Sequence, residues 1–307
     1  MTMHALDGEQ TLAAVSISDA IGAVRAGFVS LAAGELEMPQ RTAFDQGAYL
    51  VMAARHAPTR SLMTKILSLN FEGRSPAIVG SVVYTTLDSV DQVVLDAGAV
   101  TALRTGAASG VATDLLAPAG ASSCAMVGAG AQAAFQVRAM HAVRPLSQLT
   151  VADTDRRRAE ELAALLSQEL AGVSVDATDR PRSAVRGKDI VCCATNSTVP
   201  LFEADDLSPR AHVNAIGAYR PTMHELPGDL LASSFVCVDQ LDAVLAESGE
   251  IIDALSGGQL RPADLTELGA ALSRPDLPTP GRTVFKTVGV AMQDWAIAAL
   301  VAKRLPR

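Results

Sequence analysis

Strand and helix signals alternate regularly through the second half of this chain. Short apolar runs typical of buried strands are each followed by a segment with helical or turn character. This alternation is typical of a doubly wound parallel sheet with helices on both faces. The pattern therefore predicts an α/β fold for residues 119–290. The apolar runs are CAMVG, QLTVAD, VSVDAT, DIVCCAT, HVNAIG and FVCVD.

The first of these runs leads into a glycine-rich turn, MVGAGAQAAFQ, at residues 126–136. Gly128, Gly130 and Ala133 occupy the three small-residue positions of the G-x-G-x-x-G/A fingerprint, which permits a tight turn, close approach of a pyrophosphate and close helix packing. The N-terminus of the following helix offers free N–H groups to phosphates. A turn that serves only packing has the same residues. The place of this turn at the first strand of the alternation favours a dinucleotide site.

An acidic residue lies at the position where a dinucleotide site binds the adenosine ribose. Asp153 ends the second apolar run, about twenty residues beyond the glycines, where a carboxylate accepts hydrogen bonds from ribose hydroxyls and repels a 2′-phosphate. This position favours NAD(H). The arginines at 156–158 begin three residues after Asp153, and one of them could meet a 2′-phosphate instead of lying in solvent. NADP(H) therefore stays open.

Two further segments follow buried runs. Residues 194–196 (Ala-Thr-Asn) and 217–219 (Gly-Ala-Tyr) each come directly after an apolar run. Ligands of open parallel sheets bind outside the carboxyl ends of the strands. Both segments are candidates for the ribose and nicotinamide side of the cofactor, although ordinary loops also occupy such positions.

The first half of the chain has a different pattern. A capped amphipathic helix is predicted over 16–31, several strands over 49–95, and a helix rich in small residues over 98–116. Turns such as FEGRSP indicate antiparallel pairing of the strands. We expect a smaller α+β substrate and dimerisation domain at 1–118, joined by the C-terminal helix of 291–307. The Rossmann-type domain then spans 119–290.

Three cations of the first half stand in apolar or small-residue surroundings: Arg41, Lys65 and Arg104. Lys65 lies in LMTKILSLN, where burial is costly without a partner and would lower the pKa of the amine. Arg104 lies in ALRTGAASG, where a guanidinium could hold a carboxylate bidentately. Each of the three could equally be a salt-bridged side chain of a structural element.

Composition and charge argue against several classes of binding partner. The net charge of -8 argues against nucleic-acid binding, which needs a basic face. The N-terminus has no signal-peptide pattern, and no apolar run is long enough to span a membrane. The four cysteines lie in apolar runs without metal-ligand spacing, so we expect reduced structural cysteines in a cytoplasmic protein and no metal. Adjacent Cys192 and Cys193 should point to opposite faces of a strand.

Motifs spread over most of the chain resemble the ornithine cyclodeaminase/mu-crystallin family. They are LRTGAASGVAT at 103–113, VGAGAQAAFQ at 127–136, VNAIGAYRPTMHEL at 213–226, AESGE at 246–250 and TVFKTVGVAMQDWA at 283–296. The resemblance implies a homodimer in which Arg41, Lys65 and Arg104 surround a substrate α-carboxylate and imino nitrogen, with Lys65 as the catalytic residue. It also implies a set of cofactor-binding residues: Thr105, Gly128, Ala129, Gly130, Ala131, Gln132, Asp153, Thr154, Arg158, Ala194, Thr195, Asn196, Ile216, Gly217, Lys286, Val288 and Gly289.

One position departs from the family's cyclodeaminases, which carry an acidic residue after the NAxGG-type strand. Tyr219 stands there in this chain, and a phenol, with an ordinary pKa of about 10, is no carboxylate base. The resemblance therefore implies an NAD(P)-dependent oxidoreductase of small imino or amino acids, such as a ketimine reductase or an alanine dehydrogenase. An ornithine or lysine cyclodeaminase and a mu-crystallin-like ligand-binding protein are the alternatives.

His212 and His224 flank the strand-end segment that contains Tyr219. Asp294 is interpreted as a carboxylate in the first turn of the last helix, where the helix dipole stabilises it.

Overall fold

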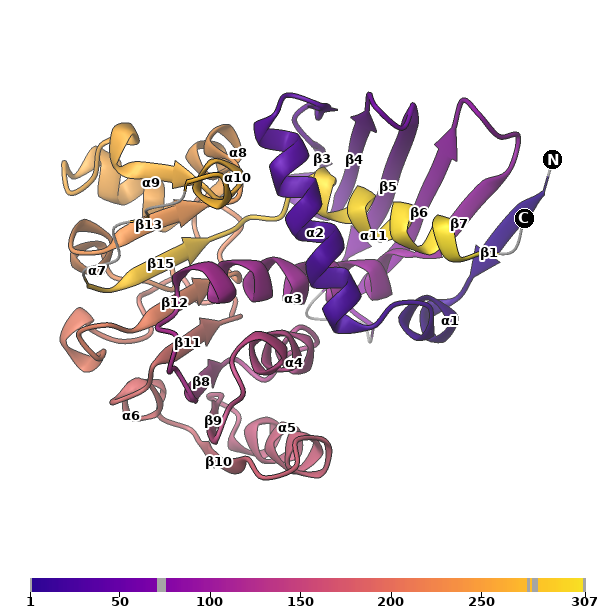
Figure 1. Cartoon of the computed structure of the whole chain (residues 1–307). Coiled ribbons are helices and arrows are strands. Elements are labelled where there is room, and N and C mark those ends of the chain that lie inside the picture. Colours follow the sequence, from indigo (N-terminus) through magenta and orange to yellow (C-terminus); the bar gives the residue numbers. More distant parts are fainter. Residues whose placement is uncertain (1, 71–75, 275–276, 278–280, 306–307) are drawn as a thin grey trace. The chain divides into compact units, whose positions relative to one another are not determined.

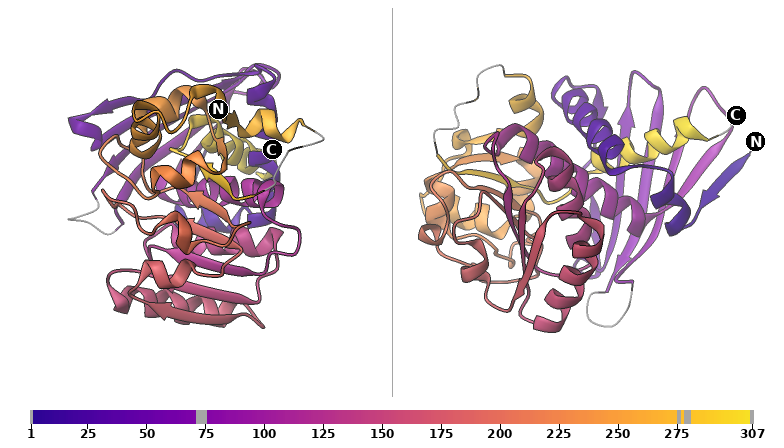
Figure 2. Two further views of the ribbon diagram at one scale, coloured as in Figure 1. Left: turned by 90° about the vertical axis from the view of Figure 1, so that its left-hand side faces the viewer. Right: turned by 60° about the horizontal axis from the view of Figure 1, so that its bottom comes forward.

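The structure is a computed structural model that describes residues 2–70, 76–274, 277 and 281–305 of the chain (Figures 1 and 2). The chain divides into two compact units. Unit 1 comprises Met1–Ala108 and Val290–Arg307, and unit 2 comprises Ser109–Gly289. This division lies inside helix α3 (Ala97–Leu116), whereas the sequence analysis places the boundary after residue 118.

Unit 1 is built on a seven-stranded sheet, as far as the described residues show, of order β1-β7-β6-β5-β4-β2 with β3 paired to β4. Strands β4 to β7 pair antiparallel, as the turn signals predict, and β1 runs parallel to β7. The FEGRSP turn lies almost wholly outside the described residues. The strands are β1 (Met3–Leu6), β2 (Leu36–Glu37), β3 (Thr42–Phe44), β4 (Tyr49–His56), β5 (Ser61–Leu69), β6 (Ile78–Thr86) and β7 (Gln92–Asp96).

Helices from both ends of the chain pack together in unit 1. The short α1 (Gly8–Ala13) precedes α2 (Ile17–Ala32), whose N-cap Ser16 accepts a hydrogen bond from the N–H of Asp19. Helix α11 (Ala291–Arg304) packs against α2 and β4–β6 (Figure 1). At Gly27 of α2 a β-carbon would collide with Met292 of α11, so the two helices approach more closely than a larger residue allows.

Unit 2 is a doubly wound sheet of eight parallel strands, counted over the described residues, of order β10-β9-β8-β11-β12-β15-β13-β14. The chain runs outward from β8 to β10 and then returns to β11, so the strand order reverses between β8 and β11. Ligands of such sheets bind at this switch point. The strands are β8 (Ser123–Val127), β9 (Gln148–Ala152), β10 (Ser174–Thr178), β11 (Ile190–Cys193), β12 (His212–Ala215), β13 (Phe235–Val238), β14 (Leu265–Glu267) and β15 (Thr283–Lys286).

Two apolar clusters lie on the two faces of this sheet. Residues of α4 (Ala133–Val143) and α5 (Arg156–Glu169) join one cluster, and residues of α6 (Pro181–Val185), α7 (Gly228–Ala232), α8 (Leu241–Glu247) and α9 (Gly249–Ser256) join the other. Helix α10 (Leu268–Leu272) packs on β13 and β14. Cys192 belongs to the first cluster and Cys193 to the second, as the alternation of a strand predicts. All four cysteines are buried thiols.

The sequence analysis located most of these elements but missed several. Helix α4 begins slightly later than its predicted start at Ala131. Strands β1, β2, β3, β14 and β15 and the short helices α1 and α7 to α10 were not predicted, because their segments are too short for a periodic pattern. Much of the 274–282 loop lies outside the described residues. No described helix is both long and apolar enough to cross a membrane.

Candidate active site

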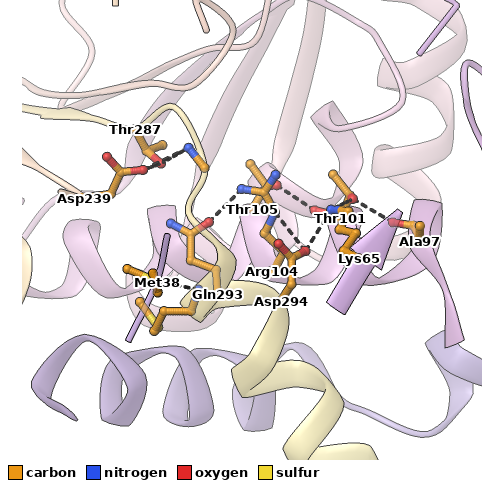
Figure 3. Close-up of polar contacts among 12 residues, drawn as sticks. Met38, Lys65, Ala97, Thr101, Arg104, Thr105, Asp239, Thr287, Gln293 and Asp294 are labelled. Atoms are coloured by element: carbon orange, nitrogen blue, oxygen red, sulfur yellow. Dashed lines mark hydrogen bonds and ion pairs between the residues drawn. The ribbon is translucent and has the colours of Figure 1, made fainter. Parts of the chain in front are cut away.

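The polar centre of unit 1 is a buried lysine on a strand (Figure 3). Strand β5 alternates, so that Lys65 points inward with Met63 and Leu67. Its Nζ donates to Asp294 Oδ1 at 2.8 Å and to Thr101 Oγ1 at 2.5 Å. Both charged side chains are almost wholly buried, and burying a charge is tolerated only where a partner compensates it. The buried lysine that the sequence predicts therefore has a carboxylate partner that the sequence analysis did not identify.

Arg104 lies at the edge of the same cluster. Its Nη1 donates to Gln293 Oε1 at 2.6 Å, and its Nε lies 3.6 Å from Asp294 Oδ1. Arg104 follows Thr101 by one turn of α3, which brings both side chains toward α11. Its side chain is 11% exposed, against 1% for Lys65, so Arg104 is the more accessible cation.

The charges of the cluster act on Lys65. The pKa of the Lys65 ammonium is lowered to about 8, mainly by burial and also by the charges of Arg104 and Arg41, while Asp294 opposes this shift. Lys65 and Arg104 thus both lie within 4 Å of the Asp294 carboxylate. A guanidinium such as that of Arg104 can also hold a carboxylate of a ligand.

The neighbouring Thr105, a predicted cofactor contact, is buried. Its hydroxyl donates to the carbonyl oxygen of Thr101 within α3 at 2.6 Å. This bond occupies the Thr105 proton and leaves its oxygen lone pairs as acceptors. Its predicted role toward the cofactor stays a prediction.

In unit 2, the glycine turn connects β8 to α4. Gly128 has a φ of +99°, and a β-carbon there would lie 2.5 Å from the carbonyl oxygen of Ala194, so only glycine fits. Among the described residues, a β-carbon on Gly130 would meet only Arg158 Nη2, at 3.9 Å, so this backbone is open to a ligand. Ala133 is fully buried where α4 packs on the sheet. These features are those of a pyrophosphate-binding turn.

The remaining turn residues also leave an acceptor available. Ala131 and Gln132 lead into α4, with Gln132 at its N-cap. Gln132 Oε1 is buried, and within the described ranges no donor reaches it. A buried acceptor of this kind needs a donor such as a hydroxyl or N–H group. The turn therefore fits a dinucleotide.

Asp153 lies at the carboxyl end of β9 beside this turn. Its Oδ2 accepts a hydrogen bond from the N–H of Ala129 at 2.7 Å, and its Oδ1 accepts one from the N–H of Asp155 at 3.0 Å. The carboxylate is thus oriented by the backbone, with lone pairs left for other donors. Thr154 lies exposed in the turn that follows.

The arginines after Asp153 divide into two groups. Arg156 pairs with Glu160 and Arg157 with Glu161 along the exposed face of α5. The Arg158 guanidinium instead lies near Gly130. The predicted role of Arg158 toward the cofactor stays a prediction.

The ends of β11 and β12 meet at a buried glutamate that the sequence analysis missed. Glu225 accepts hydrogen bonds from Thr195 through its Oε1 and from Gly217 and Ala218 through its Oε2. The predicted cofactor residues of this edge are Ala194, Thr195 and Asn196 after β11, and Ile216 and Gly217 after β12. Glu225 stands within the VNAIGAYRPTMHEL motif, but only the fold brings it back to the strand ends.

The end of β15 is held by buried side chains as well. Lys286 Nζ lies 2.9 Å from Glu250 Oε1 and donates to the carbonyl oxygen of Ala218 at 2.6 Å. Asp239 Oδ2 accepts hydrogen bonds from the N–H groups of Val288 and Gly289. The Lys286 side chain is therefore engaged inside unit 2. Its cofactor role, like those of Val288 and Gly289, stays a prediction.

Tyr219 occupies the position where the resemblance implies an acid in the cyclodeaminases. The Tyr219 ring is half-buried, with the Arg220 guanidinium 5.2 Å from its centroid. His224 pairs with Asp253 at 2.8 Å. His212 is buried between Asn214 and Thr283, and burial lowers its pKa to about 3. Over the described residues no group of His, Cys, Asp or Glu side chains has the arrangement of a metal site.

The chain is similar to known proteins along most of its length. A family model described as the ornithine cyclodeaminase/mu-crystallin family matches residues 4–306. The chain belongs to this family. An L-lysine cyclodeaminase of Streptomyces rapamycinicus is 37% identical over 290 residues, which cover 89% of this chain and 82% of the relative.

Solved structures of family-like proteins share the fold. The Δ1-pyrroline-2-carboxylate reductase of Thermococcus litoralis, in complex with NADH and L-proline, has a TM-score of 0.91 and 26% identity, covering 99% of this chain and 97% of that chain. An archaeal alanine dehydrogenase dimer with bound NAD has a TM-score of 0.89 and 27% identity, covering 99% and 96%. The fold is thus the Rossmann-type α/β fold that the sequence predicts.

Proposed function

We propose that this chain uses NADH to reduce a small α-imino acid, cyclic or linear, to the L-amino acid, or catalyses the reverse dehydrogenation. The observation that carries this proposal is the buried Lys65–Asp294 pair beside Arg104. The Arg104 guanidinium suits an α-carboxylate, and a buried lysine suits a nitrogen that gains a proton.

NAD(H) supplies the hydride donor or acceptor when it is bound in unit 2. The open backbone at Gly130, the buried Gln132 acceptor and the oriented Asp153 carboxylate support this cofactor. The NADH and NAD complexes of the two structural neighbours support it too. Asp153 favours NAD(H) over NADP(H), because a carboxylate repels a 2′-phosphate.

Each cation has a distinct part in the proposed reaction. Arg104, the more accessible cation, holds the substrate carboxylate together with Arg41. Lys65 stays protonated through its contact with Asp294 and supplies the proton that the substrate nitrogen takes up as hydride reaches the α-carbon. The C=N electron pair becomes the N–H bond, so the step needs no further reagent. Thr101 fixes the direction of the ammonium group.

A second candidate function is lysine or ornithine cyclodeamination, which the 37% identity to a lysine cyclodeaminase favours. Tyr219 disfavours cyclodeamination, since the resemblance implies a carboxylate at this position in the family's cyclodeaminases. Glu225 is no substitute, because its oxygens already accept hydrogen bonds from the ends of β11 and β12.

The apolar outer face of the unit 1 sheet supports a homodimer. Side chains of β4, β5 and β6 on the face opposite Lys65 are exposed, among them Tyr49, Leu62, Ile66 and Val79. Several large apolar side chains exposed on one face of a sheet favour an interaction surface. A second copy of this chain is the proposed cover, in keeping with the dimer of the alanine dehydrogenase neighbour.

An NADH-oxidation screen tests the function. Its substrates are pyrroline-2-carboxylate, piperideine-2-carboxylate, and pyruvate with ammonia or with methylamine. Ornithine and lysine are assayed in parallel for ammonia release. The proposal expects NADH consumption with at least one imino acid. Ammonia release from the diamino acids without NADH consumption would instead establish a cyclodeaminase, and ligand binding without any turnover a binding protein.

A further inference from the structure

Glu225 connects two loops that the proposed cofactor site needs. Resting on the proposed NAD(H) site, we propose that Glu225 is a positioning residue for the nicotinamide half of the cofactor. Glu225 acts indirectly, by holding the backbone at the ends of β11 and β12. Its effect is therefore confined to the nicotinamide half and does not extend to the adenosine half.

Four hydrogen bonds converge on this carboxylate. Oε1 accepts from the N–H of Thr195 at 2.7 Å and from its hydroxyl at 2.9 Å. Oε2 accepts from the N–H groups of Gly217 at 2.7 Å and Ala218 at 3.2 Å. One oxygen therefore serves the end of β11 and the other serves the end of β12. The two carboxylate oxygens thus hold one loop each, with two hydrogen bonds accepted by each oxygen.

The two loops are in direct contact at Gly217. A β-carbon on this residue would collide with the backbone of Thr195 and with Glu225 Oε1. The chain thus needs glycine here for the loops to meet. This contact ties the position of one loop to that of the other.

A second layer of charge holds Glu225 itself. Glu250 Oε2 accepts the N–H of Glu225 at 2.7 Å, and Lys286 pairs with Glu250 and donates to the carbonyl oxygen of Ala218. Burial raises the pKa of Glu225, whereas Lys286 and the hydrogen bonds from Thr195 oppose the rise. The buried side chains of Glu225, Glu250 and Lys286 thus fix the two short loops. Burying three charged groups costs free energy, so packing of the loops alone does not explain them.

The place of these loops in the sheet points to the nicotinamide half. The glycine turn follows β8, and Asp153 at the end of β9 marks the adenosine ribose. Strands β11 and β12 lie on the other side of β8, beyond the switch point. A dinucleotide that crosses the switch point therefore places its second half at the ends of β11 and β12.

Fragment binding tests this inference with the variant Glu225→Gln. The glutamine amide offers one acceptor oxygen, so one loop loses its partner. Dissociation constants are measured by calorimetry for NADH and for ADP-ribose, which lacks the nicotinamide. We expect NADH affinity to fall by about tenfold or more, as for a lost buried hydrogen bond, with ADP-ribose affinity within about twofold of the original protein. Glu160→Gln, on the exposed face of α5, is the matched control.

Gly217→Ala disturbs the same contact without a change of charge and should reproduce the pattern. Gly120→Ala is its control, because a β-carbon there meets nothing within 4 Å. Equal losses for both ligands, or no loss in either folded variant, would overturn the role of Glu225. Failure of the unmodified chain to bind NADH would instead refute the proposed cofactor site.

Discussion

Lys65 and Asp294 form a buried ion pair in unit 1 although 229 residues separate them in the chain. The strand β5 supplies the lysine, and the C-terminal helix α11 supplies the carboxylate. Isolated buried ion pairs add little to stability, because removing both charges from water costs as much as their attraction returns. A chemical role for the ammonium group explains the pair better than stability does.

Replacing Lys65 should remove the proton donor. We expect Lys65→Ala to lower kcat by about 10²–10⁴-fold on the true substrate, the usual contribution of general acid catalysis. NADH affinity should stay nearly unchanged, since the predicted cofactor residues other than Thr105 belong to unit 2 and Lys65 is not among them. Steady-state kinetics and NADH fluorescence titration measure the two effects. The exposed Lys303→Ala is the control, and near-normal turnover of Lys65→Ala would contradict the assignment.

Asp294 should set the pH range of activity. The pKa of Lys65 is about 8, and Asp294 raises it against burial, Arg104 and Arg41. The reduction requires protonated Lys65, so its rate falls as the pH rises through this value. Asp294→Asn removes the charge that favours the ammonium, and the alkaline limb of kcat/KM should move to lower pH. Asp294→Glu keeps the charge and should retain more of the original limb. An unmoved limb in Asp294→Asn would show that Asp294 does not act on Lys65.

Asp153 should determine the choice between the two nicotinamide cofactors. The original protein is expected to have a higher kcat/KM with NADH than with NADPH, because the carboxylate repels a 2′-phosphate. Asp153→Asn should narrow this preference, mainly through the KM for NADPH, with Arg158 nearby to meet the phosphate. A preference of the original protein for NADPH would show that Asp153 does not determine the choice of cofactor.

The apolar face of the unit 1 sheet should carry the dimer. Ile66 is 57% exposed on β5, and Ile66→Asp should convert the dimer to a monomer in analytical ultracentrifugation, because a charge buried in an interface is costly. Leu165→Asp places the same charge on α5 of unit 2, where Leu165 is 44% exposed, and should leave the dimer intact. A dimer that survives Ile66→Asp would place the interface elsewhere.

The sequence predicts the fold well where its patterns are long. The alternation after residue 119 and the glycine turn locate the parallel sheet and its first strand, and the capped helix predicted over 16–31 is confirmed as α2, with Ser16 as its N-cap. The resemblance also singles out Lys65 and Arg104, which the structure brings together around one carboxylate.

What the sequence does not predict depends on long-range pairing. Asp294 has a sufficient local explanation at the start of a helix, so its partnership with Lys65 emerges only when α11 packs beside β5. Glu225 follows an irregular segment without periodicity, and nothing local indicates that its carboxylate returns to Thr195 and Gly217. Buried charges are placed by tertiary structure, and a single sequence shows only their residue type.

Transfer of labelled hydride tests the central claim most directly. The protein is incubated with the imino acid that the screen selects and with NADH deuterated at the transferring position of nicotinamide C4, and the amino acid formed is analysed by mass spectrometry and NMR. The proposal predicts one deuterium on the α-carbon of an L-amino acid. An amino acid formed without deuterium at that carbon, or no reduction of any imino acid by folded, NADH-bound protein, would contradict it.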